Sequence, residues 1–201
     1  MTLGAALGEL AAAATAPVPD AAAAEALLAF EELVRSWRAR TDLVAGEGAA
    51  LREVLFLDAF ALASPALLPE ASRVIDVGAG AGAPAIPLAL LRPDLVLTLL
   101  EPRRRRVAFL RTAVGTLGLV GRVRVLEGRL DDPPGPELRG AFDVGFSRAT
   151  FAPDEWVRRG AALARRTLVL GAAELPAGAV SETRYAVPST GAPRAIGVYG
   201  A

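Results

Sequence analysis

The sequence predicts an α/β protein in which a helical extension precedes a mostly parallel sheet of about seven strands. From Ser72 onward, short apolar runs alternate with helical segments, a pattern typical of parallel sheets with right-handed crossovers. Residues 1–70 instead carry apolar stripes at helical spacing, interrupted by prolines. A chain of 201 residues is long enough for one compact domain. We therefore expect an N-terminal helical extension over residues 1–70 and the sheet-containing core over residues 71–201.

The extension is expected to hold three helices. The first covers residues 3–14, which are rich in Ala and Leu, and Pro17 ends the pattern. Asp20 can cap the second helix, whose apolar stripe runs from Leu27 to Trp37. The third helix spans about residues 49–63 and ends before a proline.

The core is expected to alternate between strands and helices along the chain. Its last two strands follow each other without a helix, which predicts an antiparallel hairpin at the edge of the sheet. The expected strands are 73–77, 95–101, 122–127, 141–146, 167–171, 182–187 and 194–199, and the expected helices are 84–92, 103–117 and 153–165.

A glycine-rich turn follows the first predicted strand, within the stretch VIDVGAGAGAPAIPLAL that covers residues 74–90. Ligands of open α/β sheets bind at the carboxyl ends of the strands, and glycine lets a ligand approach the backbone closely. A dinucleotide, a nucleoside triphosphate and S-adenosylmethionine can all be held in this way. The spacing from Gly78 and Gly80 to Ala83 also fits a permissive form of the nicotinamide fingerprint. The glycines alone therefore leave the ligand open.

The neighbours of the turn favour S-adenosylmethionine. Asp76 lies two residues before the first glycine, where it would repel a pyrophosphate and attract an ammonium or sulfonium group. Pro84 and Pro87 lack the N–H groups that a phosphate-binding helix end would use. A Walker-type loop needs a lysine, and the chain contains none.

Carboxylates also follow the next two predicted strands. Glu101 ends the second strand, 23 residues after Gly78, where an acidic residue can bind both hydroxyl groups of a ribose. Asp131 and Asp132 follow the third strand, where the adenine would lie. These positions predict a methyltransferase site with S-adenosylmethionine as cofactor.

The composition limits the chemistry that this chain can perform. It contains no His, Lys, Cys, Asn or Gln, so imidazole bases, Schiff bases and thiolate sites are excluded. We expect no metal site.

No apolar stretch is long enough to span a membrane, and the chain does not start with the basic residues of a signal peptide, so we expect a cytoplasmic protein. Residues 71–201 hold 18 arginines against 12 carboxylates, which weakly favours an anionic partner for this part.

Four segments together resemble the glucose-inhibited division protein B family: residues 74–90, 101–110, 128–132 and 142–149. Upstream, residues 37–43 and 56–60 are similar to two further motifs of that family, so the resemblance covers about residues 28–171. It implies an S-adenosylmethionine-dependent methyltransferase of Rossmann-like fold that acts on guanine N7 of small-subunit ribosomal RNA. N7 carries a free lone pair, so its methylation needs no general base, and positioning would supply most of the catalysis.

The resemblance also implies roles for individual residues. Gly78 and Ala83 would line the methionine part of the cofactor, Glu101 would bind the ribose, and Leu130 and Asp131 would flank the adenine. Asp76 and Gly80 join this set on the reasoning from the turn itself. The last member, Arg148, follows the apolar run of the fourth strand and is the candidate catalytic residue.

Arg148 can be interpreted in two ways. Its guanidinium can pair with the cofactor carboxylate or with a nucleotide phosphate. The alternative is a surface arginine paired with Asp143 or Asp76. On the first interpretation we expect Arg148 to face the cofactor and the entering base rather than solvent, and its removal hardly to change stability; a clear loss of stability with normal methyl transfer would indicate a structural role.

Some positions depart from the family pattern. Val54 and Leu55 stand where the family has Arg-His, Ala85 replaces a glycine, and Leu170 stands where the family tends to have lysine. Three alternatives remain: a degenerate family member that binds cofactor without transferring methyl, a methyltransferase with a different substrate, and a nicotinamide-dependent oxidoreductase.

The run from Arg103 to Arg106 opens a predicted helix. We favour a solvated helix face over a patch that contacts ribosomal RNA.

Overall fold

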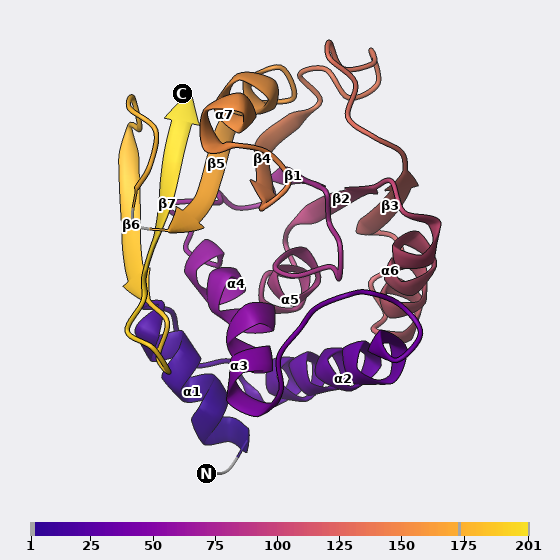
Figure 1. Ribbon diagram of the computed structural model, residues 1–201, viewed down its shortest axis with the longest axis vertical. Helices are drawn as coiled ribbons and strands as arrows, with labels where there is room; N and C mark the ends of the chain where they lie inside the picture. Colours follow the sequence, from indigo (N-terminus) through magenta and orange to yellow (C-terminus); the bar gives the residue numbers. More distant parts are fainter. Residues whose placement is uncertain (1–2, 173, 201) are drawn as a thin grey trace.

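The computed structural model describes residues 3–172 and 174–200. It confirms the predicted fold class, with a seven-stranded sheet in the order β3-β2-β1-β4-β5-β7-β6 (Figure 1). Strands β1 to β5 are parallel to one another, whereas β7 is antiparallel to both β5 and β6. The strands are β1 (Arg73–Val77), β2 (Val96–Glu101), β3 (Val123–Glu127), β4 (Phe142–Arg148), β5 (Ala164–Ala172), β6 (Ser181–Ala186) and β7 (Pro193–Gly200).

The helices cover the two faces of the sheet unequally (Figure 1). One face carries the N-terminal helices together with α5 and α6, and the other carries α7, which packs on β5 and β4. The helical elements are α1 (Leu3–Ala13), α2 (Ala21–Arg38), α3 (Gly48–Arg52), η1 (Glu53–Leu57), α4 (Asp58–Leu62), α5 (Ala85–Leu91), α6 (Arg104–Thr116) and α7 (Pro153–Ala161). No described helix is long and apolar enough to cross a membrane.

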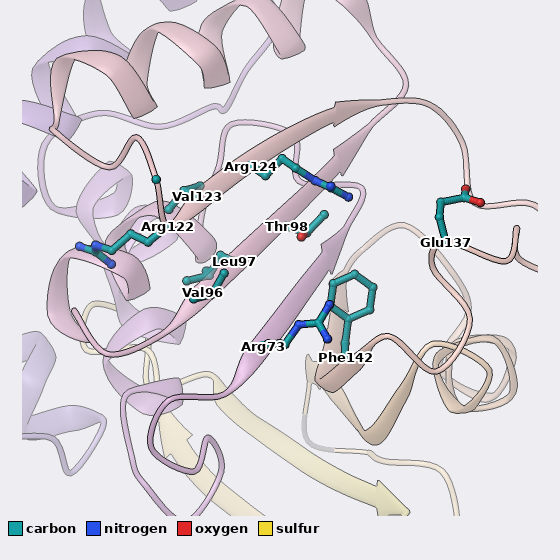
Figure 2. A pocket seen from close by; sticks show the side chains of 10 residues that line it. Arg73, Val96, Leu97, Thr98, Arg122, Val123, Arg124, Glu137 and Phe142 are labelled. Carbon is teal, nitrogen blue, oxygen red and sulfur yellow. The ribbon is translucent and has the colours of Figure 1, made fainter.

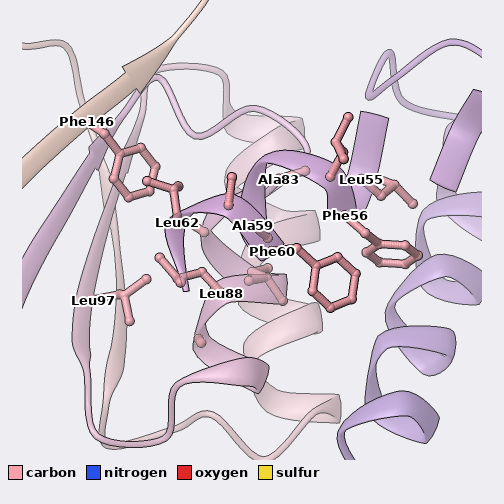
Figure 3. Close-up of a cluster of buried hydrophobic side chains, with 14 of the residues drawn as sticks. Leu55, Phe56, Ala59, Phe60, Leu62, Ala83, Leu88, Leu97 and Phe146 are labelled. Carbon is pink, nitrogen blue, oxygen red and sulfur yellow. The ribbon is translucent and has the colours of Figure 1, made fainter. Parts of the chain in front are cut away.

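The larger core joins the N-terminal helices to the sheet. Figure 3 shows Leu62 and Ala59 of α4 packed near Leu88 of α5, with Phe146 of β4 and Leu97 of β2 on the sheet side. Successive strand residues face opposite sides, so Val74 contributes to this core, whereas its neighbour Ile75 contributes to a second core under α7.

The predicted third helix is interrupted by a π-helical turn, η1, between α3 and α4. Such turns insert one extra residue into a helix and are frequent at functional sites. Here the turn precedes Asp58, a carboxylate that the helix carries into the core with only 4% of its surface exposed. The sequence pattern of this segment does not show the interruption, because its apolar positions fit a regular helix as well.

The predicted helix over residues 153–165 is wrong at its C-terminal end. Helix α7 ends at Ala161, and β5 begins at Ala164, three residues before its predicted start. Pairing decides this boundary, because Phe142 opens β4 opposite Ala164 and its N–H donates to the carbonyl of Leu163. The polar pair Arg165 and Arg166 extends a helical pattern in the sequence but lies in the strand. The β4 strand likewise continues to Arg148, two residues beyond its predicted end.

One face of the sheet remains open over β2 and β3. The chain passes from β3 to β4 through residues 128–141, which form no helix, and α7 lies over β4 and β5 instead (Figure 1). Among the described residues, therefore, no helix covers β2 and β3 on this side.

Candidate functional site

The glycine turn joins β1 to α5 at the carboxyl edge of the sheet. Its first residues are fixed to the next strand, because the N–H groups of Gly78 and Ala79 donate to the carbonyl of Leu100 at 2.8 and 3.2 Å. Gly78 has a φ of +81°, and a β-carbon there would overlap the side chain of Thr150. Gly80 has a φ of +57°, but a β-carbon there would have no described neighbour closer than 3.7 Å. The space over Gly80 is therefore open to a ligand.

Glu101 holds the turn in place from the end of β2. One carboxylate oxygen accepts a hydrogen bond from the N–H of Gly80 at 2.8 Å, and the other accepts from the N–H of Arg103 at 2.9 Å. The side chain is buried, with 2% of the residue exposed. Each carboxylate oxygen has a second lone pair, so Glu101 can also accept hydrogen bonds from ribose hydroxyl groups.

A cavity of about 300 Å³ opens beside the turn. Val77, Gly78 and Leu100 form its floor at the strand ends, and Leu130 and Phe151 line it from the loops that follow β3 and β4. We call it the cofactor cavity, since its place is that of the ligand in open α/β sheets.

The predicted cofactor residues are not all at this cavity. Gly78 and Leu130 line it, whereas Asp76, Gly80, Glu101 and Arg148 are not part of its lining. Ala83 is packed among the core side chains near α4, as Figure 3 shows, and Asp131 is exposed outside the lining. Their predicted roles toward a cofactor stay predictions.

Asp76 is buried beneath the turn with an unsatisfied oxygen. Its Oδ2 has no hydrogen-bond partner among the described residues, and 2% of the residue is exposed. Burial raises the pKa of this carboxyl group to about 8; Glu101 adds to the shift and the positive charge of Arg148 opposes it. A buried carboxylate of this kind is stabilised by a cationic group that enters beside it.

Arg148 binds the N-terminal helices. Its Nη1 donates to the carbonyl of Val54 at 2.8 Å and to Oδ2 of Asp58 at 3.0 Å. The hydroxyl of Tyr185 on β6 donates to the other oxygen of Asp58 at 2.9 Å. This network joins α4, β4 and β6, and burial together with the Asp58 charge raises the pKa of Tyr185 above its usual range.

The alternative pairing of Arg148 with Asp143 or Asp76 is wrong, whereas its pairing with a cofactor carboxylate or a phosphate stays a prediction. Its ion pair is with Asp58, whereas Asp143 accepts from the backbone N–H of Arg73. Arg148 is 23% exposed and neutralises a buried carboxylate, which argues against the expectation that its removal hardly changes stability. Sequence reasoning did not propose Asp58 and Tyr185 as site residues. The signal for Asp58 was a single acid inside the apolar run VLFLDAFAL, whereas the sequence holds no signal that pairs it with Tyr185, 127 residues away.

A second cavity, of about 410 Å³, lies next to Arg148. Arg148 and Ala149 line this second cavity, whereas Thr150 and Phe151 line the cofactor cavity, so one short segment separates the two. Ala149 has a φ of +56°, a conformation that non-glycine residues rarely adopt and that often marks a functional segment. The arrangement can place one ligand in each cavity, on the two sides of residues 148–151.

The arginine run is partly engaged within the chain. Arg103 and Arg106 both form ion pairs with Asp42, and Arg104 pairs with Glu127. Arg105 is exposed and forms no ion pair with any residue that the structure describes. The pairs with Asp42 fix the loop after α2 beside the glycine turn.

Comparisons with known proteins agree with this geometry. A family model, GidB, described as rRNA small subunit methyltransferase G, matches residues 23–167. Ribosomal RNA small subunit methyltransferase G of Mycobacterium marinum is 44% identical over 100 residues, covering 50% of this chain and 43% of that protein. The proteins of the same name from Mycobacterium leprae and Frankia alni are 48% identical over 89 residues and 50% identical over 84 residues. These two matches cover 44% and 41% of this chain, but only 36% and 32% of the relatives.

Solved structures share the fold at low sequence identity. The S-adenosylmethionine-dependent methyltransferase SibL, in its apo form, superimposes with a TM-score of 0.52 at 20% identity, covering 85% of this chain and 69% of that chain. TrmN of Thermus thermophilus superimposes with a TM-score of 0.51 at 22% identity, covering 71% and 47%. The family model spans most of the chain, and the sheet order is that of the methyltransferase fold. The chain belongs to the GidB family, that of rRNA small subunit methyltransferase G.

Proposed function

We propose that this protein is an S-adenosylmethionine-dependent methyltransferase that methylates guanine N7 in small-subunit ribosomal RNA. The observation that carries the proposal is the unsatisfied, buried Asp76 carboxylate beside the open backbone at Gly80, in a member of this family. The three curated relatives described above are each matched over less than half of their length, so their names support the substrate and do not establish it.

The residues around the glycine turn and the cofactor cavity fit S-adenosylmethionine. Asp76 offers an oxygen to the ammonium of the methionine part, and its burial disfavours a pyrophosphate at the same place. Glu101 retains acceptor capacity for the ribose hydroxyl groups, and Leu130 offers an apolar wall for the adenine. When bound, the cofactor supplies a methyl group on a positively charged sulfur.

The chain's own residues suit a reaction that needs no general base. It contains neither His nor Lys, and Tyr185 keeps its proton because its pKa is raised. Guanine N7 is already nucleophilic, so what remains for the protein is to bind, orient and exclude water. We assign the second cavity to the entering base, with Arg148 and Ala149 facing it from the end of β4. Arg148 then positions the base or the cofactor carboxylate while Asp58 holds its guanidinium.

The proposal includes the partner and its location. Small ribosomal subunits would supply the substrate in the cytoplasm. Arg105, exposed on the first turn of α6, is the member of the arginine run with an uncompensated charge for RNA phosphates.

The test is methyl transfer from radiolabelled S-adenosylmethionine to small ribosomal subunits that lack the modification. Reduction and aniline cleavage would then locate any N7-methylguanosine. Label in one guanine, lost with Gly80→Val, is the expected result. Cofactor binding without label in the RNA would show a degenerate family member, and label in a protein or in a ribose would refute the assigned substrate.

A further inference from the structure

A third cavity, of about 530 Å³, lies on the open face of the sheet (Figure 2). Figure 2 shows Arg73 of β1, Thr98 of β2 and Arg124 of β3 along this face, with Phe142 beside Arg73. Neither the cofactor cavity nor the second cavity shares a residue with its lining.

The strand register orders the side chains of this face into rows. Arg73 of β1 pairs with Val96 of β2. Leu97 pairs with Val123, so the preceding residues, Val96 and Arg122, also lie opposite each other. Arg73, Val96 and Arg122 therefore form the first row. Ile75, Thr98 and Arg124 form the second row, two residues further along the strands. The third row contains Val77 and Leu100, which line the cofactor cavity. From the first row to the third is four residues, or about 13 Å along a strand.

The arginines of this cavity are not neutralised by their surroundings. Arg73, Arg122 and Arg124 form no ion pair with any carboxylate in the described part of the chain. The guanidinium of Arg73 lies over the Phe142 ring at 5.9 Å, and Nη1 of Arg122 is shielded from water without a hydrogen-bond partner among the described residues. The ring contact orients Arg73, and none of the three guanidinium groups is held by an ion pair with a described residue.

Few carboxylates oppose this charge. Glu137 is the acidic residue in the lining, on the loop beyond Arg124 in Figure 2. Asp94 interacts electrostatically with Arg122 but is already bound by Arg92, and Asp143 accepts a hydrogen bond from the backbone N–H of Arg73. The lining therefore carries a net positive charge.

This chemistry favours a chain of phosphates over one small anion. Guanidinium groups bind phosphate oxygens through two parallel hydrogen bonds. Arg73 and Arg124 stand two strands apart, or about 10 Å at the spacing of neighbouring strands, which suits contact with different phosphates. Val96 is 47% exposed in the first row and offers an apolar contact to a ribose or a base.

We propose that this cavity binds the phosphodiester backbone of an RNA strand, as a contact separate from the methyl-transfer site. The identification of the polyanion as RNA rests on the proposed function. A strand that reaches both the first row and the cofactor cavity would span about 13 Å, which a few nucleotides cover.

The experiment measures the binding of a fluorescent small-subunit ribosomal RNA transcript at several salt concentrations. The variants are Arg124→Gln, Arg73→Gln and the double variant. Arg111→Gln is the matched control, because Arg111 is exposed on α6, on the opposite face of the sheet, and forms no ion pair with a described residue. Each phosphate contact contributes about 0.7 to 0.9 to the slope of log affinity against log salt.

The double variant should lower that slope by about 1.4 to 1.8 and weaken RNA binding severalfold at low salt. Arg111→Gln should leave both unchanged, and S-adenosylmethionine should bind every variant as it binds the wild type. Replacement of both arginines by lysine should restore most of the slope, since the charge returns.

An unchanged slope in the double variant would overturn this inference, even where the wild type transfers methyl to the RNA. If the double variant does not fold, the exposed Arg124→Gln decides by the same criterion with a slope change of about 0.7 to 0.9. Inorganic phosphate or adenosine monophosphate serves as a competitor. If these small anions bind the cavity while the arginine substitutions leave RNA binding unchanged, the cavity is a site for small anions and the inference is also overturned. Failure of the proposed function is distinct, because it would show RNA binding without methyl transfer.

Discussion

Substitution of Asp76 by Asn tests the proposed cofactor site most directly, because it removes one buried ionisable group and keeps the shape of the side chain. With a pKa of about 8, roughly a tenth of the wild-type protein carries the ionised carboxylate at pH 7 and about half at pH 8. If the ammonium of S-adenosylmethionine binds only the ionised form, the apparent dissociation constant scales with the inverse of that fraction. Affinity should then rise about tenfold from pH 6 to pH 7 and about fivefold from pH 7 to pH 8.

The same shift has a consequence for stability. The unfolded chain loses this proton near pH 4, whereas the folded protein keeps it until about pH 8. Between these values the folded state binds more protons than the unfolded state, so the free energy of unfolding decreases as pH rises, by at most about 1.4 kcal/mol per pH unit. Asp76→Asn lacks this group. The free energy of unfolding of this variant, relative to the wild type, should therefore increase as the pH rises between these two pKa values.

Titration calorimetry at pH 6, 7 and 8, in buffers of different ionisation enthalpy, measures affinity and proton release together. The wild type should release close to one proton per cofactor bound at pH 6, and Asp76→Asn should bind weakly with no pH dependence from this group. Urea unfolding of both proteins at pH 5 and pH 7 checks the stability difference. Wild-type affinity that is flat from pH 6 to pH 8, without proton release, would refute the assignment of Asp76 to the ammonium.

Three further changes test the remaining parts of the site. Arg148→Ala should reduce methyl transfer by one to two orders of magnitude and also destabilise the fold by about 3–5 kcal/mol, because it leaves the Asp58 charge buried and unpaired. Adding Asp58→Ala should recover stability, measured by urea unfolding, but not transfer; recovery of both would make the pair structural. Tyr185→Phe should cost about 1–3 kcal/mol in the same unfolding assay, since Asp58 loses a buried donor, and no loss would show that water replaces the hydroxyl. Gly80→Val should abolish cofactor binding by calorimetry, whereas Gly118→Val, with a similar φ of +67° and open surroundings, should only destabilise; equal binding by both variants would place the ligand elsewhere.

Much of the fold was predictable because it depends on local patterns. The apolar runs of β1 and β2 could be recognised because all but the first residue of each strand are buried, and the glycines and prolines mark where the runs end. The predicted ends fail where pairing overrides the local pattern. The register of β5 against β4 places Arg165 and Arg166 in a strand, although their neighbours continue a helical pattern.

The candidate site was predictable in part for the same reason. Strand ends meet at one edge of a parallel sheet, so Gly78, Gly80 and Glu101 could be brought together from strand order alone. The bond from Gly80 N–H to Glu101 requires the actual turn, and the core position of Ala83 depends on how α4 packs. Neither follows from spacing.

The sequence by itself determined the alternation of strands and helices, the position of the glycine turn and the exclusion of His, Lys and Cys chemistry. Those properties reside in residue types and in spacings along the chain. Only the tertiary structure decided that Arg148 binds Asp58 and that Tyr185 completes the network, because these three residues come from elements up to 127 positions apart. It also decided that Arg73, Arg122 and Arg124 share one open face, since that depends on strand register and on the absence of a covering helix in the described chain. Long-range packing sets the partners of a charged group, and no local pattern encodes them.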